Sequence, residues 1–142
     1  MLFVTLLLCK LVSCMLQIFH MGSSLPGKLA LRLRKNMIAE LSRFWRVVLV
    51  TGTNGKTTTT AMLYNMLLAA GISAVTNTEG ANMSGGIAAA LIKGKPLFCK
   101  PKPGGIAVLE VDEAYMRTVA PACKPEMIIV TNVFKDQLDR FG

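Results

Sequence analysis

The chain has little of what metal centres and disulfide frameworks require. Its 142 residues include one histidine and four cysteines, and the cysteines stand apart without a Cys-x-x-Cys pair, at Cys9, Cys14, Cys99 and Cys123. This spacing gives neither a zinc-ligand pattern nor a disulfide scaffold. Three of the four cysteines have apolar neighbours, so we expect buried thiols and a reducing, cytoplasmic compartment. His20 is assigned no chemistry.

Acidic residues are scarce as well. Eight Asp and Glu residues stand against sixteen Lys and Arg residues, which gives a formal net charge of +8. A basic balance of this kind favours anionic partners. No recognition helix, zinc finger or aromatic RNA-binding pattern accompanies the charge, so we expect no nucleic acid partner and interpret the charge as a solvated basic surface.

The apolar segment 1–19 lacks the features of a signal peptide and of a membrane span. Its only lysine, Lys10, lies in the middle of the run, and no basic region precedes it. On a helix, Lys10, Ser13, Gln17 and His20 form one narrow stripe and leave a wide apolar face. Two interpretations stay open: residues 1–20 make peripheral contact with a membrane surface, or the helix packs on the rest of the protein.

What the sequence does contain is a Gly-rich turn between an apolar run and a helical pattern. The run 47–50 leads directly into eight residues, which are Thr51, Gly52, Thr53, Asn54, Gly55, Lys56, Thr57 and Thr58. A strand followed by such a turn and a helix is the layout of a phosphate-binding loop. Glycines let the backbone aim several N–H groups at one point, and the helix N-terminus adds its dipole. We therefore predict that the loop binds a nucleoside triphosphate.

Two side chains of this loop have distinct predicted tasks. Lys56 places its ammonium group on the β- and γ-phosphates, and the Thr57 hydroxyl coordinates the Mg²⁺ that accompanies ATP. The loop is shorter than the general Walker A pattern, whose first Gly would fall at position 50, where this chain has Val50. Gly-rich turns also occur without ligands, but the strand, the Lys-Thr pair and the helix in register favour nucleotide binding.

Strand and helix patterns alternate along the rest of the chain. After a helical segment over 1–46, with amphipathic helices between 26 and 46, strands are predicted at 47–51, 72–76, 106–112 and 127–131. Helices are predicted at 57–70, closed by Gly71, at 87–92, and at 113–119, ended by Pro121. This alternation indicates an α/β fold, with a P-loop-type, mostly parallel sheet and helices on both faces. Ligands of such sheets bind beyond the carboxyl ends of the strands.

Polar residues close the third and fourth predicted strands. Period-two geometry puts Glu110 and Asp112 on one face of the third strand, at its carboxyl end. Because a carboxylate in an apolar strand is costly unless it is paired or bound to a cation, we predict that Glu110 meets the Mg²⁺ held by Thr57. For Asp112, metal binding and a bond to a neighbouring loop are equal alternatives. Glu113 is expected to cap or solvate the following helix.

After the fourth strand, three polar residues recur at short spacing. Asn132, Asp136 and Asp139 face one cleft if Asp136 opens a helical turn, since three-residue spacing keeps to one side of a helix. Equally, Asp136 and Asp139 are first-turn carboxylates of a solvated helix.

These motifs together resemble the central ATPase domain of the Mur ligase superfamily. The resemblance rests on 51–57, 109–112, 131–136 and 138–139. Segments 22–28, 77–83 and 136–142 look more closely like the family of Mur-ligase-like subunits of lipid II isoglutaminyl synthase. Because several separated segments agree in order, the resemblance is specific, and it extends from Gly22 to the end of the chain.

The resemblance implies an ATP-dependent, amide-forming ligase of peptidoglycan biosynthesis that works at the cytoplasmic face of the membrane. In this family ATP phosphorylates the α-carboxylate of D-isoglutamate in the stem peptide of lipid II. Ammonia from a GatD-like glutamine amidotransferase subunit, the partner in a heterodimer, then displaces the phosphate. An acyl phosphate is needed because a free carboxylate resists attack by an amine.

Individual roles also follow from the resemblance. Residues 52–58 bind ATP, Lys56 stabilises charge on the transferred phosphoryl group, and Thr57 with Glu110 holds Mg²⁺. Asn132 and Asp136 match the turn that lines the active site. Many Mur ligases have a metal-binding histidine where this chain has Gln137, which speaks against a second metal site of that kind.

The resemblance further implies that residues 47–142 are the first part of a longer ATP-binding domain. The family continues with the rest of that domain, an inserted four-cysteine zinc ribbon and a C-terminal domain. We therefore expect zinc only downstream, and no complete reaction by this chain alone. The alternative functions are another Mur-type amino-acid or folate-glutamate ligase, and a non-catalytic nucleotide-binding fragment.

Overall fold

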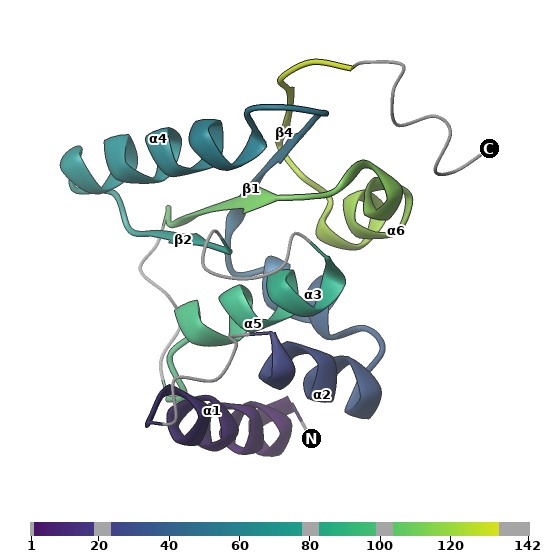
Figure 1. The fold of residues 1–142 in the computed structure, drawn as a ribbon. Coiled ribbons are helices and arrows are strands. Elements are labelled where there is room, and N and C mark those ends of the chain that lie inside the picture. The colour runs from purple at the N-terminus through teal and green to yellow at the C-terminus, as the bar shows by residue number, and fades with distance from the viewer. Residues whose placement is uncertain (1, 19–23, 78–82, 99–103, 134–142) are drawn as a thin grey trace.

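The fold is an α/β sandwich preceded by three helices (Figure 1). The computed structural model describes residues 2–18, 24–77, 83–98 and 104–133, with the side chains of the first range described up to Ser13. The elements are α1 (Leu2–Ile18), α2 (Leu25–Leu33), α3 (Met37–Ser42), β1 (Arg46–Thr51), α4 (Lys56–Ala69), β2 (Ala74–Thr76), α5 (Ser84–Gly94), β3 (Ile106–Glu110), α6 (Glu113–Cys123) and β4 (Met127–Val130).

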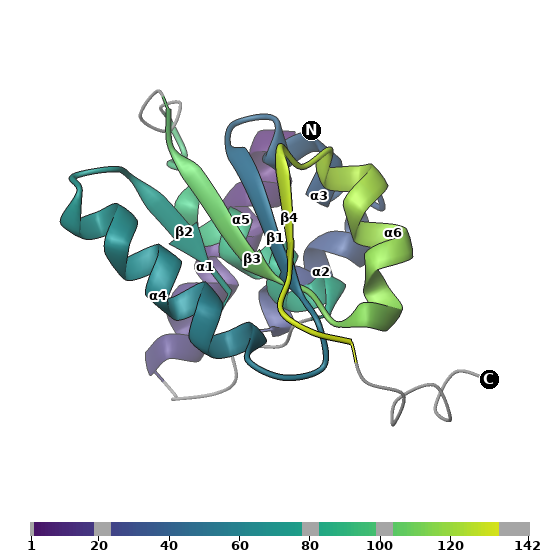
Figure 2. The ribbon, with the colours of Figure 1, turned by 90° about the horizontal axis from the view of Figure 1, so that it is seen from above.

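The four described strands form one parallel sheet in the order β2-β3-β1-β4 (Figure 2). The central strands β1 and β3 are buried almost throughout, in accord with their apolar sequences. Their register pairs Val50 with Glu110. Because β1 has a neighbour on each side, the loop that follows it lies in the middle of the carboxyl edge of the sheet. The predicted parallel α/β architecture is confirmed.

Helices cover the sheet on both faces, as predicted (Figure 1). Helix α4 packs on one face, and α5 and α6 pack on the other, with α3 in contact with both. Helices α2 and α1 form an outer layer beyond α5. Among the described helices, none is long and apolar enough to cross a membrane.

The outer layer shares a core with the sheet because α2 and α5 approach very closely. A Cβ atom on Gly27 would lie 1.8 Å from the carbonyl oxygen of Gly85, so only glycine fits there. Below this contact, Leu6 and Cys9 of α1 join the same buried cluster as Leu91 of α5. Burial also raises the pKa of the Cys9 thiol. The apolar face of α1 is therefore divided between a buried part and an outward part.

Several element boundaries differ from the sequence prediction. Helix α6 was expected to end before Pro121, but it continues through this residue to Cys123 and stops at Lys124, which has a left-handed φ of 47°. In the last turn, proline removes only one backbone donor, so the turn can still form. Strand β3 ends at Glu110, because Asp112 caps α6 by accepting a hydrogen bond from the Ala114 amide at 3.1 Å. Helix α5 begins three residues earlier than predicted, at Ser84.

Strand β4 is less covered than the central strands. It pairs with β1 alone among the described strands, and three of its apolar side chains are exposed, those of Met127, Ile128 and Val130. The expectation of strands covered on both faces thus holds for β1 and β3 and not for β4.

Candidate nucleotide-binding site

The turn after β1 uses two glycines in left-handed conformations, with different surroundings. Gly52 has a φ of 129°, and a Cβ atom there would lie 2.3 Å from the Thr131 hydroxyl oxygen and 2.6 Å from the Asn132 carbonyl oxygen. Gly55 has a φ of 81°, and a Cβ atom there would meet nothing within 4 Å. Gly52 therefore lets the loop pack on the end of β4, whereas Gly55 shapes a turn that faces open space.

The end of β4 holds the loop through backbone groups. The Asn132 side chain accepts a hydrogen bond from the Asn54 amide at 2.9 Å and donates one to the Asn54 carbonyl at 3.1 Å. The Asn132 carbonyl accepts a further bond from the Thr53 amide at 2.9 Å. The Thr131 hydroxyl donates to the Asn54 carbonyl at 2.7 Å. These contacts fix the loop without a ligand, so its amide groups are already oriented.

The N-terminus of α4 is open to a ligand. Gly55 is the N-cap and has no side chain to satisfy the amides of the first turn, and the first helical bond runs from the Thr59 amide to the Gly55 carbonyl at 2.9 Å. The side chains of Thr57 and Thr58 are exposed in this turn. A helix of 14 residues presents a partial positive charge at such an end, which favours an anion.

Lys56 lies folded over the loop. Its ammonium group donates hydrogen bonds to the carbonyl of Gly52 and, at 3.2 Å, to the carbonyl of Thr53. Glu113 Oε2 lies 3.4 Å from the same nitrogen, and the Lys56 side chain is only 11% exposed. The charge is thus held at the loop by two carbonyls and one carboxylate.

Glu113 differs from its expected role at the start of α6. The helix cap is supplied by Asp112, and Glu113 faces Lys56 instead. Its second oxygen, Oε1, is buried without a hydrogen-bond partner among the described residues. The sequence alone did not indicate this contact because Glu113 lies 57 residues from Lys56 along the chain.

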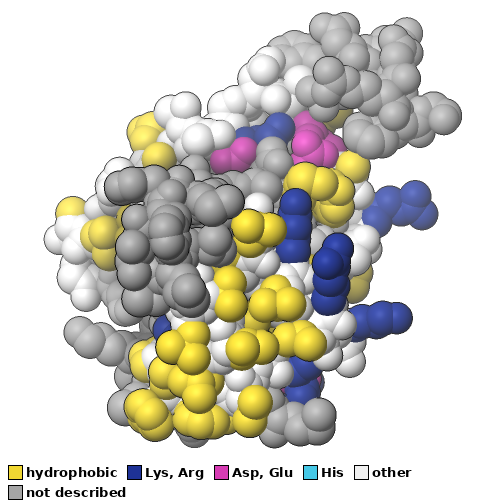
Figure 3. Space-filling model, turned by 60° about the horizontal axis from the view of Figure 1, so that its bottom comes forward, with side chains coloured by type: hydrophobic (Ala, Val, Ile, Leu, Met, Phe, Trp, Pro, Cys, Tyr) yellow, Lys and Arg dark blue, Asp and Glu magenta, His cyan; other side chains and the backbone are white. Residues whose placement is uncertain are grey.

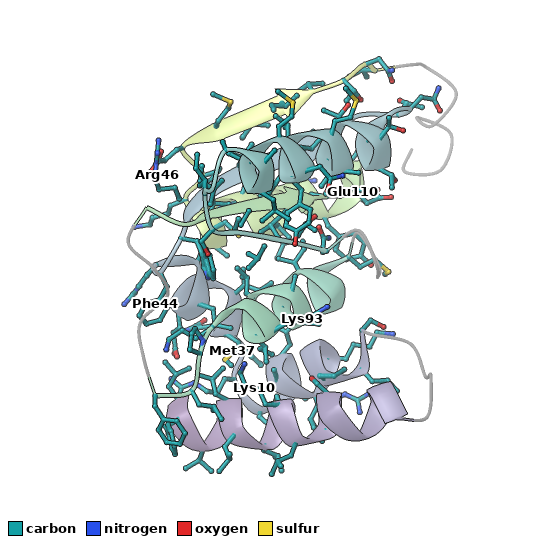
Figure 4. All side chains as sticks on the ribbon, turned by 90° about the vertical axis from the view of Figure 1, so that its left-hand side faces the viewer. Lys10, Met37, Phe44, Arg46, Lys93 and Glu110 are labelled. Atoms are coloured by element: carbon teal, nitrogen blue, oxygen red, sulfur yellow. The ribbon has the colours of Figure 1, made fainter. Side chains whose placement is uncertain are left out.

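Glu110 closes β3 beside the base of the loop. It is 7% exposed, and its peptide groups are bound by the Asn77 side chain, which accepts from the Glu110 amide and donates to its carbonyl, both at 2.8 Å. No hydrogen bond or ion pair to its carboxylate is found among the described residues. Figure 4 shows Glu110 at the end of the sheet opposite to Arg46. A buried carboxylate next to a phosphate loop is suited to an oxygen-binding cation.

The Mur ligase middle domain family matches residues 50–142, which include the loop, β3 and the end of β4. The chain belongs to the Mur ligase middle domain family.

Individual Mur ligase relatives are similar over most of the chain. The lipid II isoglutaminyl synthase (glutamine-hydrolyzing) subunit MurT of Streptococcus pneumoniae is 43% identical over 122 residues, which cover 85% of this chain and 26% of the relative. The MurT subunit of Staphylococcus aureus strain COL is 39% identical over 122 residues, which cover 85% of this chain and 27% of the relative. The UDP-N-acetylmuramoylalanine--D-glutamate ligase of Dinoroseobacter shibae is 36% identical over 97 residues, which cover 68% of this chain and 18% of the relative. The chain spans about a quarter of the length of the two MurT relatives.

Within this Mur ligase domain, the structure brings most of the predicted site residues to one edge of the sheet. Those residues are Gly52, Thr53, Asn54, Gly55, Lys56, Thr57, Thr58, Glu110 and Asn132. Asp136 lies outside the described residues. No group of three or more His, Cys, Asp or Glu side chains that could hold a metal ion occurs in the described part of the chain. The roles of Thr57 and Glu110 as Mg²⁺ ligands, and of the other residues as ATP ligands, stay predictions.

Two further residues of the Mur ligase site were not singled out from the sequence. Asn77 fixes the Glu110 peptide, and Thr131 supports the loop. A common signal was available for both, since each follows the end of a strand at the carboxyl edge, as Asn132 does. Polar residues that directly follow buried parallel strands are candidates for such a role.

Proposed function

We propose that the chain is the nucleotide-binding part of a Mur-type ligase of peptidoglycan biosynthesis that uses ATP to activate a carboxylate. The observation that carries the proposal is the loop at the N-terminus of α4, with open space at Gly55, uncapped helical amides and the Lys56 ammonium group. This donor set matches the charge and oxygen content of a polyphosphate. Membership of the Mur ligase family supports the reaction class.

The residues at the site also fit Mg²⁺. The exposed Thr57 hydroxyl and the buried Glu110 carboxylate are oxygen ligands of the kind that Mg²⁺ combines with water and phosphate oxygens. When bound, the ion neutralises charge on the phosphate oxygens. Within the protein, the Asn77 side chain fixes the Glu110 backbone, and Asn132 fixes the loop that carries Thr57. We propose that these two asparagines set the separation of the two ligands.

We propose that the carboxylate is the D-isoglutamate α-carboxylate of the lipid II stem peptide. The printed names of the two MurT relatives, which are the most similar of the three compared, support this assignment. A carboxylate oxygen attacks the γ-phosphorus of ATP and ADP leaves. Ammonia then attacks the acyl carbon and phosphate leaves, with loss of a proton from nitrogen. Ammonia comes from a GatD-like amidotransferase that hydrolyses glutamine.

Lys56 and Asp136 have different parts in this proposal. The Lys56 ammonium group, held at the loop by the carbonyls of Gly52 and Thr53, is proposed to donate to the transferred phosphoryl group. Its third partner, the Glu113 carboxylate, limits how far the side chain can move from the loop. Asp136 is proposed to line the site from the turn after β4.

Nucleotide binding is tested by calorimetry with ATP and Mg²⁺ on the chain and on Lys56→Ala. Loss of a hydrogen-bonded charge at the phosphates is expected to weaken binding at least about tenfold. Lys35→Ala, which removes an exposed lysine from the α2–α3 connection, is the control and is expected to leave affinity unchanged. Equal affinity of Lys56→Ala and the parent would contradict the assignment of the loop.

The reaction is tested with lipid II, glutamine, a GatD-like partner and ATP, with mass spectrometry of the lipid product. The assay uses a longer protein that contains this chain. The expected product is lipid II amidated at D-isoglutamate. The similarity to the D-glutamate ligase favours a second candidate, the addition of D-glutamate to UDP-N-acetylmuramoylalanine. Formation of that product in place of the amide would assign the chain to the second activity.

A further inference from the structure

The outward side of α1 is a continuous apolar surface. Five large apolar side chains are between 37% and 66% exposed, and we call them the α1 outer face: Phe3, Val4, Leu7, Leu8 and Leu11. Their spacing places them on one side of the helix. Leu6 and Cys9, on the opposite side, are buried against the protein. One side of the helix thus packs on the protein, and a second apolar side stays exposed.

The only charged residue of the described α1 side chains points away from this face. Lys10 donates a hydrogen bond to the Lys93 carbonyl of α5 at 3.4 Å, and Figure 4 shows the Lys10 side chain on the side of α1 that faces α5. Burial, with a smaller effect from the charge of Lys95, lowers the pKa of Lys10. An outward Lys10 would have been better hydrated. Its inward position leaves the α1 outer face without a charge.

Phe98 extends the same surface from the segment after α5. Its side chain is 85% exposed, and its ring lies 5.7 Å from that of Phe3 with the planes tilted by 51°. Two phenylalanines at one end of an apolar stripe make a patch of the kind that marks interaction surfaces. Figure 3 shows hydrophobic side chains gathered over this end of the molecule.

Cations border the patch. Lys28 and Arg32 of α2 are exposed, as are Lys35 and Arg43 on either side of α3. Residues 1–46 contain seven Lys and Arg residues and a single acidic one, Glu40, which forms an ion pair with Arg34. In Figure 3, Lys and Arg side chains lie alongside the hydrophobic patch, whereas Asp and Glu side chains gather at the far end of the face.

We propose that the α1 outer face docks on an anionic phospholipid bilayer, with α1 parallel to the membrane surface. The apolar side chains enter the boundary between headgroups and acyl chains, and the exposed cations of α2 and α3 contact the phosphates. Charge complementarity favours a bilayer over a second copy of the chain, because a second copy would bring the same cations against these ones. The proposal does not depend on the nucleotide site.

Vesicle flotation tests the apolar part of the surface. The chain is mixed with vesicles of phosphatidylcholine alone or of phosphatidylcholine with phosphatidylglycerol, and binding is expected to the anionic vesicles. The variant Val4→Gln/Leu8→Gln/Leu11→Gln is expected to bind the anionic vesicles with an affinity reduced at least about tenfold, since each change removes apolar area from the contact. The control Met62→Gln/Met66→Gln changes side chains of similar exposure, 60% and 64%, on α4, and is expected to bind like the parent.

The cations are tested by Lys28→Gln/Arg32→Gln/Lys35→Gln. Each cation is expected to contribute about fivefold to binding of anionic vesicles at low salt, and added salt should reduce the difference. A direct readout is Leu8→Trp, whose emission should shift to the blue and be quenched by brominated lipid only when anionic vesicles are present. This variant and the triple charge variant decide the question if the α1 glutamine variant fails to fold.

Three results would overturn the proposal. The first is no binding of the parent to anionic vesicles. The second is an equal loss of binding in the α4 control. The third is a concentration-dependent dimer that the α1 glutamine variant dissolves while lipid binding is absent, since that result would assign the face to a second copy of the chain.

Discussion

The loop edge of the sheet and the contact between α2 and α5 both depend on glycine, but in opposite ways. At the loop, side chains from the ends of β3 and β4 hold the backbone, and the space in front of Gly55 stays open. Between α2 and α5, Gly27 lets two backbones touch and leaves no space for a methyl group. One region leaves open space beside its glycine, and the other leaves none. Stability and binding should therefore respond separately to changes in the two regions.

Gly27→Ala should produce the largest loss of stability. The new methyl group would meet backbone atoms of Gly85 and Ala89, which cannot move without separating the helices, so we expect a loss of about 3 kcal/mol. Urea unfolding measures it. Gly85→Ala is the matched control with a smaller expected loss, because its methyl group would lie 2.9 Å from the Lys28 side chain and an ordinary 3.6 Å from the nearest backbone atom, the Ser24 carbonyl oxygen. A loss in Gly85→Ala as large as that in Gly27→Ala would show that the backbone contact is not what matters.

Gly55→Ala and Gly71→Ala separate backbone strain from binding. Both glycines have a left-handed φ, 81° and 73°, and a Cβ atom at either would meet nothing within 4 Å. Each change should therefore cost about 1 to 2 kcal/mol of stability from strain alone. Only Gly55→Ala should also weaken ATP binding, because Gly71 lies at the other end of α4. Calorimetry beside urea unfolding checks both quantities, and an equal loss of affinity in Gly71→Ala would contradict a local role for Gly55.

Asn132→Ala removes the side chain that holds the loop, which we call the loop clamp. Two hydrogen bonds to the Asn54 backbone are lost, but water can replace them at this exposed turn, so the expected cost is about 1 kcal/mol. ATP affinity should fall by about tenfold, since the loop must then be ordered on binding. Asn65→Ala, on the exposed side of α4, is the control and should change neither quantity. A fall in stability with unchanged affinity would mean that the loop clamp supports the fold and not the site.

The sequence was sufficient for the parts of the fold where local pattern and tertiary environment agree. Strands β1 and β3 are apolar and central, and the loop between β1 and α4 has the glycines and the Lys-Thr pair of a phosphate-binding motif. Their positions followed from period and motif. The parallel sheet and its carboxyl edge followed from the alternation of elements.

The remaining errors have identifiable physical causes. The rule that proline ends a helix failed at Pro121, since proline removes one amide donor and the other amides of the last turn can still form their bonds. Glu113 was expected to cap or solvate the following helix, because its partner, Lys56, is 57 residues away and no local pattern indicates such a contact. The sequence could not decide between the two interpretations of α1 because the helix has apolar residues on both sides: Leu6 and Cys9 are buried, and Val4 and Leu11 are exposed.

Lys10→Met should have the smallest effect and tests how α1 joins the rest of the protein. Burial lowers the pKa of Lys10 below its ordinary value of 10.5, so its charge costs stability in the folded state while the group is protonated. That cost is complete below the folded pKa and fades as the pH rises towards 10.5. Lys10→Met should therefore be more stable than the parent by about 0.5 kcal/mol or less at pH 7, and the gain should shrink in alkaline buffer. Thermal unfolding at several pH values measures this, with the exposed Lys35→Met as control. A gain that grows with pH would show that Lys10 is held by its contact with the Lys93 carbonyl and not penalised by burial.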